Sequence, residues 1–563
     1  MELLVYPLSP AGDAAHPAPA APPRCGQAAA GDDLARAVWL HGLAEPVPLC
    51  SGLGRCGRCR VRFLDQDSVP PPLPEEEDIL GPGLLAQGWR LACRRQITDG
   101  MGPELRLGVP VPEKMTQTDA RPPVAGQRPR RLALAVDLGT TSLYWRLLAV
   151  PDGDGDGGTD GAQDADSFAR LRRPAAPAPV LAAGHGLNPQ AGAGADVMSR
   201  LAVARDPGGR SRLSRLVRDH LEALLRRQTA ALPGVPVARL VLAANTAMTD
   251  IFLDRDVSGL CAAPYRRSHA GGACLREDGL PPLLVPPLPA PFVGGDISAG
   301  LLHLLAQGLP RPLVLADLGT NGELALVDRQ GRLWLTSVPL GPALEGIGPE
   351  CGRMAGPGSI TRFGLTPLGL ACHGTDGPLD DGADVRGISA TGYLSLLALL
   401  LRLGCLDADG HFCVPSSPLA RRVAPAPQQA RTGPRLPLPH GQWLAAADVE
   451  ELLKVKAAFS LALEVLLRAA DLSPADVACL ALAGALGQHC PPACLEELGF
   501  LPSGMGSRVR AVGNSSLEGA CLLAADPGRL AALADWCAAA RLVPVAEDPG
   551  FHAAYLRHMR FGV

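Results

Sequence analysis

The sequence predicts a multidomain protein of mixed α+β and α/β class, on three observations. Four cysteines gather near the N-terminus, the composition changes sharply after about residue 130, and one strand–turn–strand motif occurs twice, about 180 residues apart. A chain of 563 residues is long enough for about three to four domains, each with its own hydrophobic core.

Composition excludes several classes of protein. Charged residues make up 19% of the chain and the formal net charge is −4, so the charge indicates no nucleic-acid partner. Gly and Pro are frequent, but a hydrophobic fraction of 47% indicates a globular protein. No apolar run predicts a membrane span and no signal-peptide pattern is present, so we expect a cytoplasmic protein without a membrane partner. Its 16 cysteines should be mostly thiols or metal ligands.

The four N-terminal cysteines have the spacing of an iron–sulfur loop. A C-x5-C-x2-C pattern is followed, after 33 intervening residues, by a fourth cysteine. The four predicted ligands are Cys50, Cys56, Cys59 and Cys93. A 2Fe–2S cluster needs four thiolates, most of them from one tight loop, and the glycines of this loop let backbone N–H groups turn toward the sulfurs. A structural zinc site is a competing interpretation, although zinc sites usually present two short Cys pairs. Four unrelated buried thiols are the remaining alternative.

The flanks of the cysteine loop fit a small mixed domain. We expect an opening strand at Glu2–Tyr6, a helix at Asp32–His41 before the loop and a strand at Arg60–Leu64 after it. The segment resembles the 2Fe–2S ferredoxins with a five-residue first spacing, including the Arg-Leu-Ala-Cys at 90–93. This resemblance implies a β-grasp ferredoxin-like domain over residues 1–105.

A linker precedes the change in composition. Residues 106–130 are rich in Pro, Gln, Thr and Arg without a sustained period, which predicts a linker that lets the cluster domain move. The apolar run Leu132–Val136 then predicts a buried strand, followed by Asp-Leu-Gly-Thr and a second strand at Leu143–Val150. The same order recurs with strands at Leu313–Ala316 and Leu324–Val327, which indicates an internal duplication.

The repeated turn is typical of a phosphate-binding loop. Glycine permits a tight turn whose backbone N–H groups and Thr hydroxyls contact phosphate oxygens, and an aspartate at the strand end can hold Mg²⁺ through water. One such turn is a weak signal because Asp and Gly favour turns in general, but two copies between apolar strands are a stronger one. We predict Asp137 and Asp317 as catalytic residues. The predicted nucleotide-binding residues of the two turns are Gly139, Thr140, Thr141, Gly319, Thr320, Asn321, Gly322 and Glu323.

The duplicated turn resembles the superfamily of acetate and sugar kinases, heat-shock seventy-kilodalton chaperones and actin. In that superfamily two ribonuclease-H-like lobes close on ATP. The resemblance implies a first lobe over residues 131–312 and a second lobe with the nucleotide-binding loops over residues 313–563.

The same resemblance implies an adenosine loop near the end of the second lobe. The apolar strand expected at Cys479–Ala483 breaks into a turn of small residues, and a second turn precedes the helix expected at Leu517–Ala525. The predicted binding residues in these two turns are Gly484, Ala485, Gly513 and Asn514.

Segments between these loops narrow the resemblance to one family. They are Asn188–Gln190, Gly194–Arg200, Ala244–Thr249, Ala263–Tyr265, Phe292–Asp296, Gly341–Gly346 and Pro357–Ile360. In order and spacing they resemble the reductive activators of corrinoid proteins, which carry a 2Fe–2S domain ahead of an ATPase core.

The family resemblance implies a function and its cofactors. The implied activity is ATP-dependent reduction of an inactive Co(II) corrinoid to Co(I), with a 2Fe–2S cluster, ATP and Mg²⁺. The implied partners are a corrinoid protein of a methyltransferase system and a low-potential electron donor such as a reduced ferredoxin, and we expect a homodimer. A small-molecule kinase with a redox domain, using Asp296 as base, and a non-catalytic electron-transfer or binding protein are the alternatives.

Two further positions carry expectations that the structure can test. The chain reads Gly387-Ile-Ser-Ala390-Thr-Gly392 where the family has Gly-Ile-Cys-Gly-Ser-Gly, so Ala390 replaces a glycine at a candidate point of close approach. Lys456 lies on the helix expected at Asp448–Arg468, and we expect it on the surface rather than facing nucleotide.

Overall fold

The computed structural model describes residues 1–8, 21–47, 49, 52, 54, 56–111, 118–120, 129–151, 167–319, 321–430 and 433–562. Cys50 and Thr320, and the side chain of Ala485, lie outside this description. The chain divides into two compact units, which are described separately. Unit 1 comprises Met1–Asp152, Pro179–Ser268 and Arg276–Leu283, and unit 2 comprises Gly153–Ala178, His269–Leu275 and Leu284–Val563.

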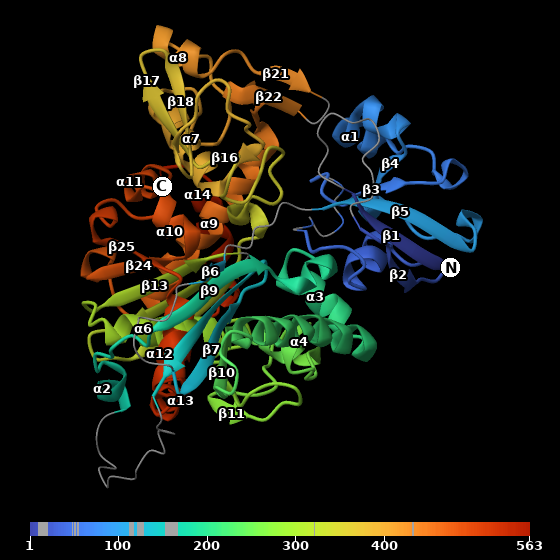
Figure 1. The fold of residues 1–563 in the computed structure, drawn as a ribbon. Coiled ribbons are helices and arrows are strands. Elements are labelled where there is room, and N and C mark those ends of the chain that lie inside the picture. The colour runs from blue at the N-terminus through green and yellow to red at the C-terminus, as the bar shows by residue number, and fades with distance from the viewer. Residues whose placement is uncertain are drawn as a thin grey trace. The chain divides into compact units, whose positions relative to one another are not determined.

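Unit 1 begins with a five-stranded sheet in the order β2-β1-β5-β3-β4 (Figure 1). Its strands are β1 (Glu2–Leu8), β2 (Arg24–Gln27), β3 (Arg60–Phe63), β4 (Trp89–Leu91) and β5 (Glu104–Pro110). β1 pairs parallel with β5 and antiparallel with β2, and β3 pairs antiparallel with β5 and β4. Leu3 and Val5 of β1 are buried and alternate with more exposed residues, as expected for a strand with one face on a core, and Leu8 is buried at its end.

Helical segments contribute to the core of this first sheet. They are η1 (Arg36–Leu40) and α1 (Pro74–Ala86). The strands expected at the opening of the chain and after the cysteine loop are confirmed. The helix expected over 32–41 forms in shortened shape: residues 34–40 are helical, and η1 within them is a π-helix whose Val38 and Trp39 are buried among the core residues.

A second sheet in unit 1 carries the first copy of the repeated motif. Its central strands are β7 (Arg131–Leu138), β8 (Ser142–Val150), β9 (Val180–Leu187) and β10 (Val237–Ala244), with β6 (Thr118–Ala120) beside β9. β7 pairs antiparallel with β8 and parallel with β10. Residues 132–136 of β7 are all buried, which explains the apolar run in the sequence. Helices of this region are α3 (Val197–Ala204), α4 (Pro207–Thr229) and α5 (Thr246–Phe252).

Unit 2 is built on a six-stranded sheet in the order β25-β24-β13-β14-β15-β26 (Figure 1). These strands are β13 (Leu313–Leu318), β14 (Asn321–Val327), β15 (Leu333–Pro339), β24 (Cys479–Ala483), β25 (Val509–Gly513) and β26 (Arg541–Leu542). β13 pairs antiparallel with β14 and parallel with β24. Each repeat is thus an antiparallel hairpin whose first strand also has a parallel neighbour, so the duplication seen in the sequence is also one of topology.

The remaining larger elements of unit 2 precede, separate or follow these strands along the chain. They are α2 (Ser167–Leu171), α6 (Gly295–Ala306), β16 (Ser359–Ile360), β17 (Arg362–Thr366), β18 (Gly369–Gly374), β19 (Gly377–Pro378), β20 (Gly387–Ile388), α7 (Ala390–Arg402), α8 (Pro418–Val423), β21 (Gln428–Ala430), β22 (Gly433–Pro437), β23 (Trp443–Ala445), α9 (Ala446–Ala469), α10 (Gly484–His489), α11 (Pro492–Glu497), α12 (Ser515–Ala525), α13 (Arg529–Ala538) and α14 (Phe551–His558). Two short strands, β11 (Ala273–Leu275) and β12 (Leu283–Val285), lie where the chain passes between the units.

The expectation for Lys456 is wrong. Helix α9 forms as expected, but Lys456 is fully buried and donates hydrogen bonds to the carbonyl oxygens of His558, at 3.1 Å, and Arg560, at 2.7 Å. Burial lowers the pKa of this amine to about 8. An amphipathic pattern could not reveal this, because the partners are main-chain carbonyls about 100 residues away.

Among the helices of the described ranges, none combines the length and apolar character that a membrane crossing requires.

Candidate functional site

The β3–β4 hairpin brings two of the predicted cluster ligands together. Cys59 directly precedes β3, and Cys93 follows two residues after β4. Arg60 lies opposite Leu91 in the ladder, and the Ala92 N–H donates a hydrogen bond to the Cys59 carbonyl at 3.0 Å. Backbone pairing therefore places both cysteines at one end of the hairpin, although 33 residues separate them in the sequence.

A cavity of about 210 Å³ opens at this end of the hairpin. Cys56, Cys59 and Cys93 line it, together with Gly192, Ala193 and Gly194 from the segment after β9. Three glycines of the cysteine loop, at positions 52, 54 and 57, have φ values of 88°, 71° and 63°, a conformation that favours glycine.

This cavity supplies donors of the type that an iron–sulfur cluster requires. Soft thiolates are the usual ligands of such clusters, and glycine turns let the backbone wrap closely around them. No three His, Cys, Asp or Glu side chains within the described ranges are arranged to hold a metal ion. Cys50, the first predicted ligand, lies outside those ranges. In donor chemistry and loop conformation, the residues fit the group.

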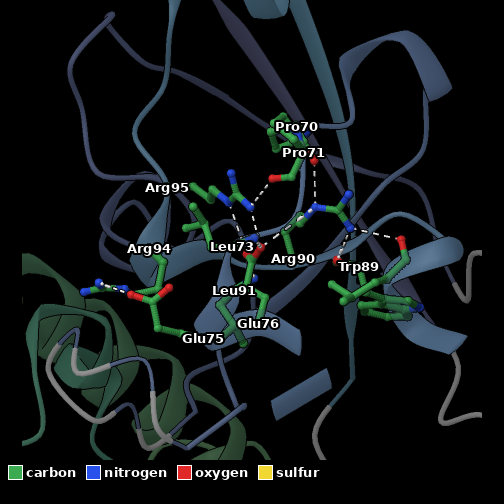
Figure 2. Close-up of polar contacts among 11 residues, drawn as sticks. Pro70, Pro71, Leu73, Glu75, Glu76, Trp89, Arg90, Leu91, Arg94 and Arg95 are labelled. Carbon is green, nitrogen blue, oxygen red and sulfur yellow. Dashed lines mark hydrogen bonds and ion pairs between the residues drawn. The ribbon is translucent and has the colours of Figure 1, made fainter. Parts of the chain in front are cut away.

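A buried carboxylate anchors the turn that carries Cys93. Figure 2 shows Glu76 of α1 between the guanidinium groups of Arg90 and Arg95. Glu76 accepts hydrogen bonds from the Leu73 N–H and the Leu91 N–H, both at 2.9 Å, and from Arg95 Nε at 3.1 Å. The sequence showed only a run of three glutamates here, and no feature of that run distinguishes the buried one.

The first phosphate-type turn is held from outside by two side chains. Asn188 Nδ2 donates to the Gly139 carbonyl at 2.8 Å, and the Asn188 N–H donates to the Thr141 carbonyl at 2.8 Å. The Arg200 guanidinium donates to the Thr140 carbonyl. Asn188 and Arg200 therefore fix the turn through its carbonyl groups. The sequence alone assigned neither residue a role, although both lie in segments that resemble the family.

The turn itself is tight. The Gly139 N–H donates to the Ser142 carbonyl at 2.9 Å, and a Cβ on Gly139 would lie 2.9 Å from that same oxygen, so only glycine fits without a shift. Asn245 follows β10, the parallel neighbour of β7, and its Nδ2 lies 3.5 Å from Thr140 Oγ1. Thr140 and Thr141 are both buried.

In unit 2 the second turn stands among carboxylates. Asp317 at the end of β13 lies opposite Glu323 of β14. Burial raises the pKa of Glu323 well above its ordinary value, and the negative charges of Asp296 and Asp317 raise it further. Like charges close together cannot all ionise easily, so this group of three acids favours either a bound cation or a retained proton. Asp296 lies in the first turn of α6.

One of the two predicted adenosine turns adjoins Asp317 within unit 2. Gly484 begins α10 with φ of 75°, and a Cβ on it would lie 3.9 Å from Asp317 Oδ1. β25 pairs with β24 so that Gly513 lies opposite Ala483, and Asn514 caps α12 by accepting a hydrogen bond from the Leu517 N–H at 2.8 Å. The structure thus brings the Gly484 and Gly513 turns to the same end of neighbouring parallel strands, where ligands commonly bind in α/β sheets.

The departure at Ala390 is accommodated. Ala390 begins α7 and is buried, and Ser389 caps the helix by accepting a hydrogen bond from the Gly392 N–H at 3.3 Å. The close approach occurs at Gly392, where a Cβ would lie 2.4 Å from the Ile360 carbonyl oxygen. The glycine that this packing requires is therefore the one that the chain retains.

Comparisons with known proteins agree with this arrangement. A family model described as the RACo middle region matches residues 177–307, and a model described as the C-terminal domain of RACo, the ASKHA domain, matches residues 311–562. The second match confirms the predicted actin/sugar-kinase-type ATPase core.

Two curated proteins are similar in sequence. The chain is 25% identical over 400 residues to the corrinoid activation enzyme RamQ of Eubacterium limosum, a match that covers 67% of this chain and 65% of that protein. It is 27% identical over 265 residues to the Co(II) methylated amine-specific corrinoid protein reductase of Methanosarcina barkeri, covering 44% of this chain and 45% of that protein. The chain thus matches less than two thirds of the length of either relative.

A solved structure shares the fold. The reductive activator for corrinoid, iron–sulfur protein superposes with a TM-score of 0.63 at 20% identity, covering 100% of this chain and 98% of that one. Since models of one family match both the middle and the C-terminal regions, the chain belongs to the RACo family, the reductive activators of corrinoid proteins.

Proposed function

We propose that the protein is an ATP-dependent reductive activator of a corrinoid protein. In this role it accepts one electron from a low-potential donor and passes it to a Co(II) corrinoid on its partner, giving Co(I). One observation carries the proposal: a single chain of the RACo family contains both a cavity lined by three cysteines and a duplicated phosphate-type turn. Relatives named as a corrinoid activation enzyme and a Co(II) corrinoid protein reductase support it.

The N-terminal part is proposed to be a β-grasp ferredoxin-like domain. Its mixed sheet, with β1 parallel to β5, and the position of the cysteines at the end of the β3–β4 hairpin support this assignment. The proposed ligands are Cys50, Cys56, Cys59 and Cys93. A 2Fe–2S cluster held there would store one electron. The chain's own contribution is to hold the thiols at one cavity and to fix the turn of Cys93 through Glu76.

The two repeated turns are proposed to bind ATP. Gly139, Thr140 and Thr141 form a tight backbone turn whose carbonyls are bound by Asn188 and Arg200, and this turn would contact the phosphate oxygens. In unit 2, Asp317 with its neighbouring carboxylates would hold hydrated Mg²⁺, and ionisation of Glu323 would accompany cation binding.

The energetics explain why such a reaction needs ATP. For one electron, each uphill step of about 59 mV corresponds to about 1.4 kcal/mol. A gap of a few hundred mV therefore amounts to several kcal/mol, more than the roughly 1–3 kcal/mol of a typical coupling between sites. Binding and turnover of nucleotide can supply the difference by favouring a protein–corrinoid arrangement in which Co(II) accepts the electron.

The proposal is tested by following the corrinoid absorbance from Co(II) to Co(I) with purified partner and reductant, with and without Mg-ATP. We expect reduction to depend on ATP and to fall by roughly 10²-fold or more in Asp317→Asn, since the turn loses its charged cation ligand. Asp328→Asn, which alters a carboxylate paired with Arg332 on the β14–β15 turn, is the matched control and should retain activity. Equal reduction without ATP would contradict the proposal.

Iron analysis tests the cluster assignment. Cys59→Ser should lose bound iron and the visible absorbance of the cluster because it removes a buried ligand. Cys25→Ser changes an exposed cysteine on β2 and should leave iron content unchanged. Retention of two irons per chain in Cys59→Ser would refute the ligand assignment. The electron donor and the homodimer stay predictions.

A further inference from the structure

One segment of unit 1 touches both the phosphate-type turn and the cysteine cavity. It comprises residues 188–194, which include the helical turn η5 (Pro189–Ala193) and lead into α3. At its start, Asn188 binds the Gly139 and Thr141 carbonyls. At its end, Gly192, Ala193 and Gly194 form part of the wall of the cavity that contains the three cysteines. Few residues therefore separate the two sites.

Arg200 of α3 joins the phosphate-type turn to the cavity wall at Gly194. Its side chain is buried, with the whole residue 1% exposed. The guanidinium donates to the Thr140 carbonyl in the phosphate-type turn, Nε donates to the Gly194 carbonyl at 3.3 Å in the cavity wall, and Nη1 donates to Gln190 Oε1 at 3.3 Å between them. One rigid, planar group thus holds both sites at fixed spacing.

The cavity wall has little room to move independently. A Cβ on Gly192 would lie 2.5 Å from Cβ of Trp39 and 2.8 Å from the backbone nitrogen of Leu40, so the segment packs directly on η1. Asp33 and Arg36, which lead into and begin η1, line the same cavity. Close-packed interiors transmit small shifts rather than absorbing them. A displacement of the Thr140 carbonyl therefore reaches the cysteine cavity through Arg200 and residues 190–194.

We propose that Arg200 is a positioning residue that couples nucleotide binding at the Gly139–Thr141 turn to the redox state of the cysteine cavity. Phosphate bound by this turn shifts the backbone at Thr140, whose carbonyl accepts a hydrogen bond from Arg200. Arg200 passes this shift to Gly194, and the movement of Gly194 changes the surroundings of the thiols. Such a coupling is reciprocal. Reduction at the cavity changes the affinity for nucleotide by the same factor by which bound nucleotide changes the equilibrium constant for that reduction. The inference rests on the proposed function.

Calorimetry on the full-length protein tests this coupling. The dissociation constant of a non-hydrolysable Mg-ATP analogue is measured anaerobically on the oxidised and on the reduced protein. In the wild type we expect the two constants to differ by about 5- to 150-fold, the range of typical allosteric couplings. In Arg200→Lys, whose one ammonium cannot reproduce the planar fork that contacts the Thr140 carbonyl, the Gly194 carbonyl and Gln190 with three separate nitrogens, the ratio should approach 1. Redox titration with and without the analogue must give a matching shift of about 59 mV for each tenfold ratio.

The controls separate coupling from general damage. Arg218→Lys makes the same change at an arginine of unit 1 that is partly buried and pairs with Glu277 rather than with the phosphate-type turn, and it should keep the wild-type ratio. Gln190→Met removes the acceptor between the two ends while keeping the side-chain length, and it should lower the ratio even if Arg200→Lys fails to fold.

The outcomes distinguish this inference from the proposed function. Equal dissociation constants for the oxidised and reduced wild type overturn the coupling, although ATP-dependent reduction of the corrinoid would still support the function. An unchanged ratio in both Arg200→Lys and Gln190→Met overturns the role of Arg200 alone. Absence of any nucleotide binding to the wild type overturns both the coupling and the proposed function.

Discussion

Replacing Glu76 with Ala should loosen the turn that carries Cys93. Glu76 is fully buried, and the substitution leaves the Leu91 N–H without its acceptor and the Arg95 guanidinium without its carboxylate partner. Removing one partner of a buried ion pair costs about 3–5 kcal/mol. Because about 1.4 kcal/mol corresponds to a factor of ten in an equilibrium constant, local opening should become roughly 100- to 4,000-fold more frequent.

Hydrogen exchange measured on peptides that cover residues 89–95 reports this opening directly. The matched control is Glu75→Ala, because Glu75 pairs with Arg94 in an exposed ion pair with side chains 46% and 38% exposed. Such pairs contribute at most about 1 kcal/mol, so the control should change exchange by less than about tenfold. If exchange at Leu91 were as slow in Glu76→Ala as in the control, the buried carboxylate would not anchor the hairpin and the reasoning would be refuted.

Three further predictions concern unit 2. Burial raises the pKa of Asp448 to about 7, so between about pH 4 and pH 7 the native state holds a proton that the unfolded state has lost. This group should therefore make stability fall as pH rises through this window, by up to about 1.4 kcal/mol per pH unit, and Asp448→Asn should remove that contribution from the free energy of unfolding measured against pH. Lys456→Met leaves two carbonyls of the C-terminal segment without the Lys456 donor. We expect hydrogen exchange in residues 551–560 to become faster, with the free energy of protection lowered by about 1–3 kcal/mol. Gly392→Ala should lower stability by about 1–3 kcal/mol through the clash with the Ile360 carbonyl, whereas Ala390→Gly should change it by at most about 1 kcal/mol, which thermal unfolding of the two variants compares.

Local patterns predicted the strands and turns that depend on nearby residues. The apolar runs around the two Asp-Leu-Gly-Thr turns lie in buried strands, and β24 forms over the same residues, 479–483, as expected. Alternation and apolar runs report which face of a segment is buried, and that information is carried by the segment itself.

Contacts between distant segments could not be predicted in the same way. Arg200 reaches Thr140 across 60 residues and Lys456 reaches His558 across 102, and in each case a side chain meets a main-chain carbonyl. A carbonyl exists at every position, so its use as a partner leaves no mark on the residue type. The same limit explains why Ala390 drew attention in the sequence while the sterically essential position is Gly392.

The β3–β4 hairpin also bears on how the protein is made. During synthesis the cysteines at 50, 56 and 59 leave the ribosome more than 30 residues before Cys93, and Cys59 and Cys93 become neighbours only when Arg60 pairs with Leu91. A nascent chain that has exposed only the loop therefore presents an incomplete set of thiols. The complete set of four thiols that we propose as cluster ligands is therefore available only after residues 60–93 have been synthesised and the hairpin has closed around Glu76.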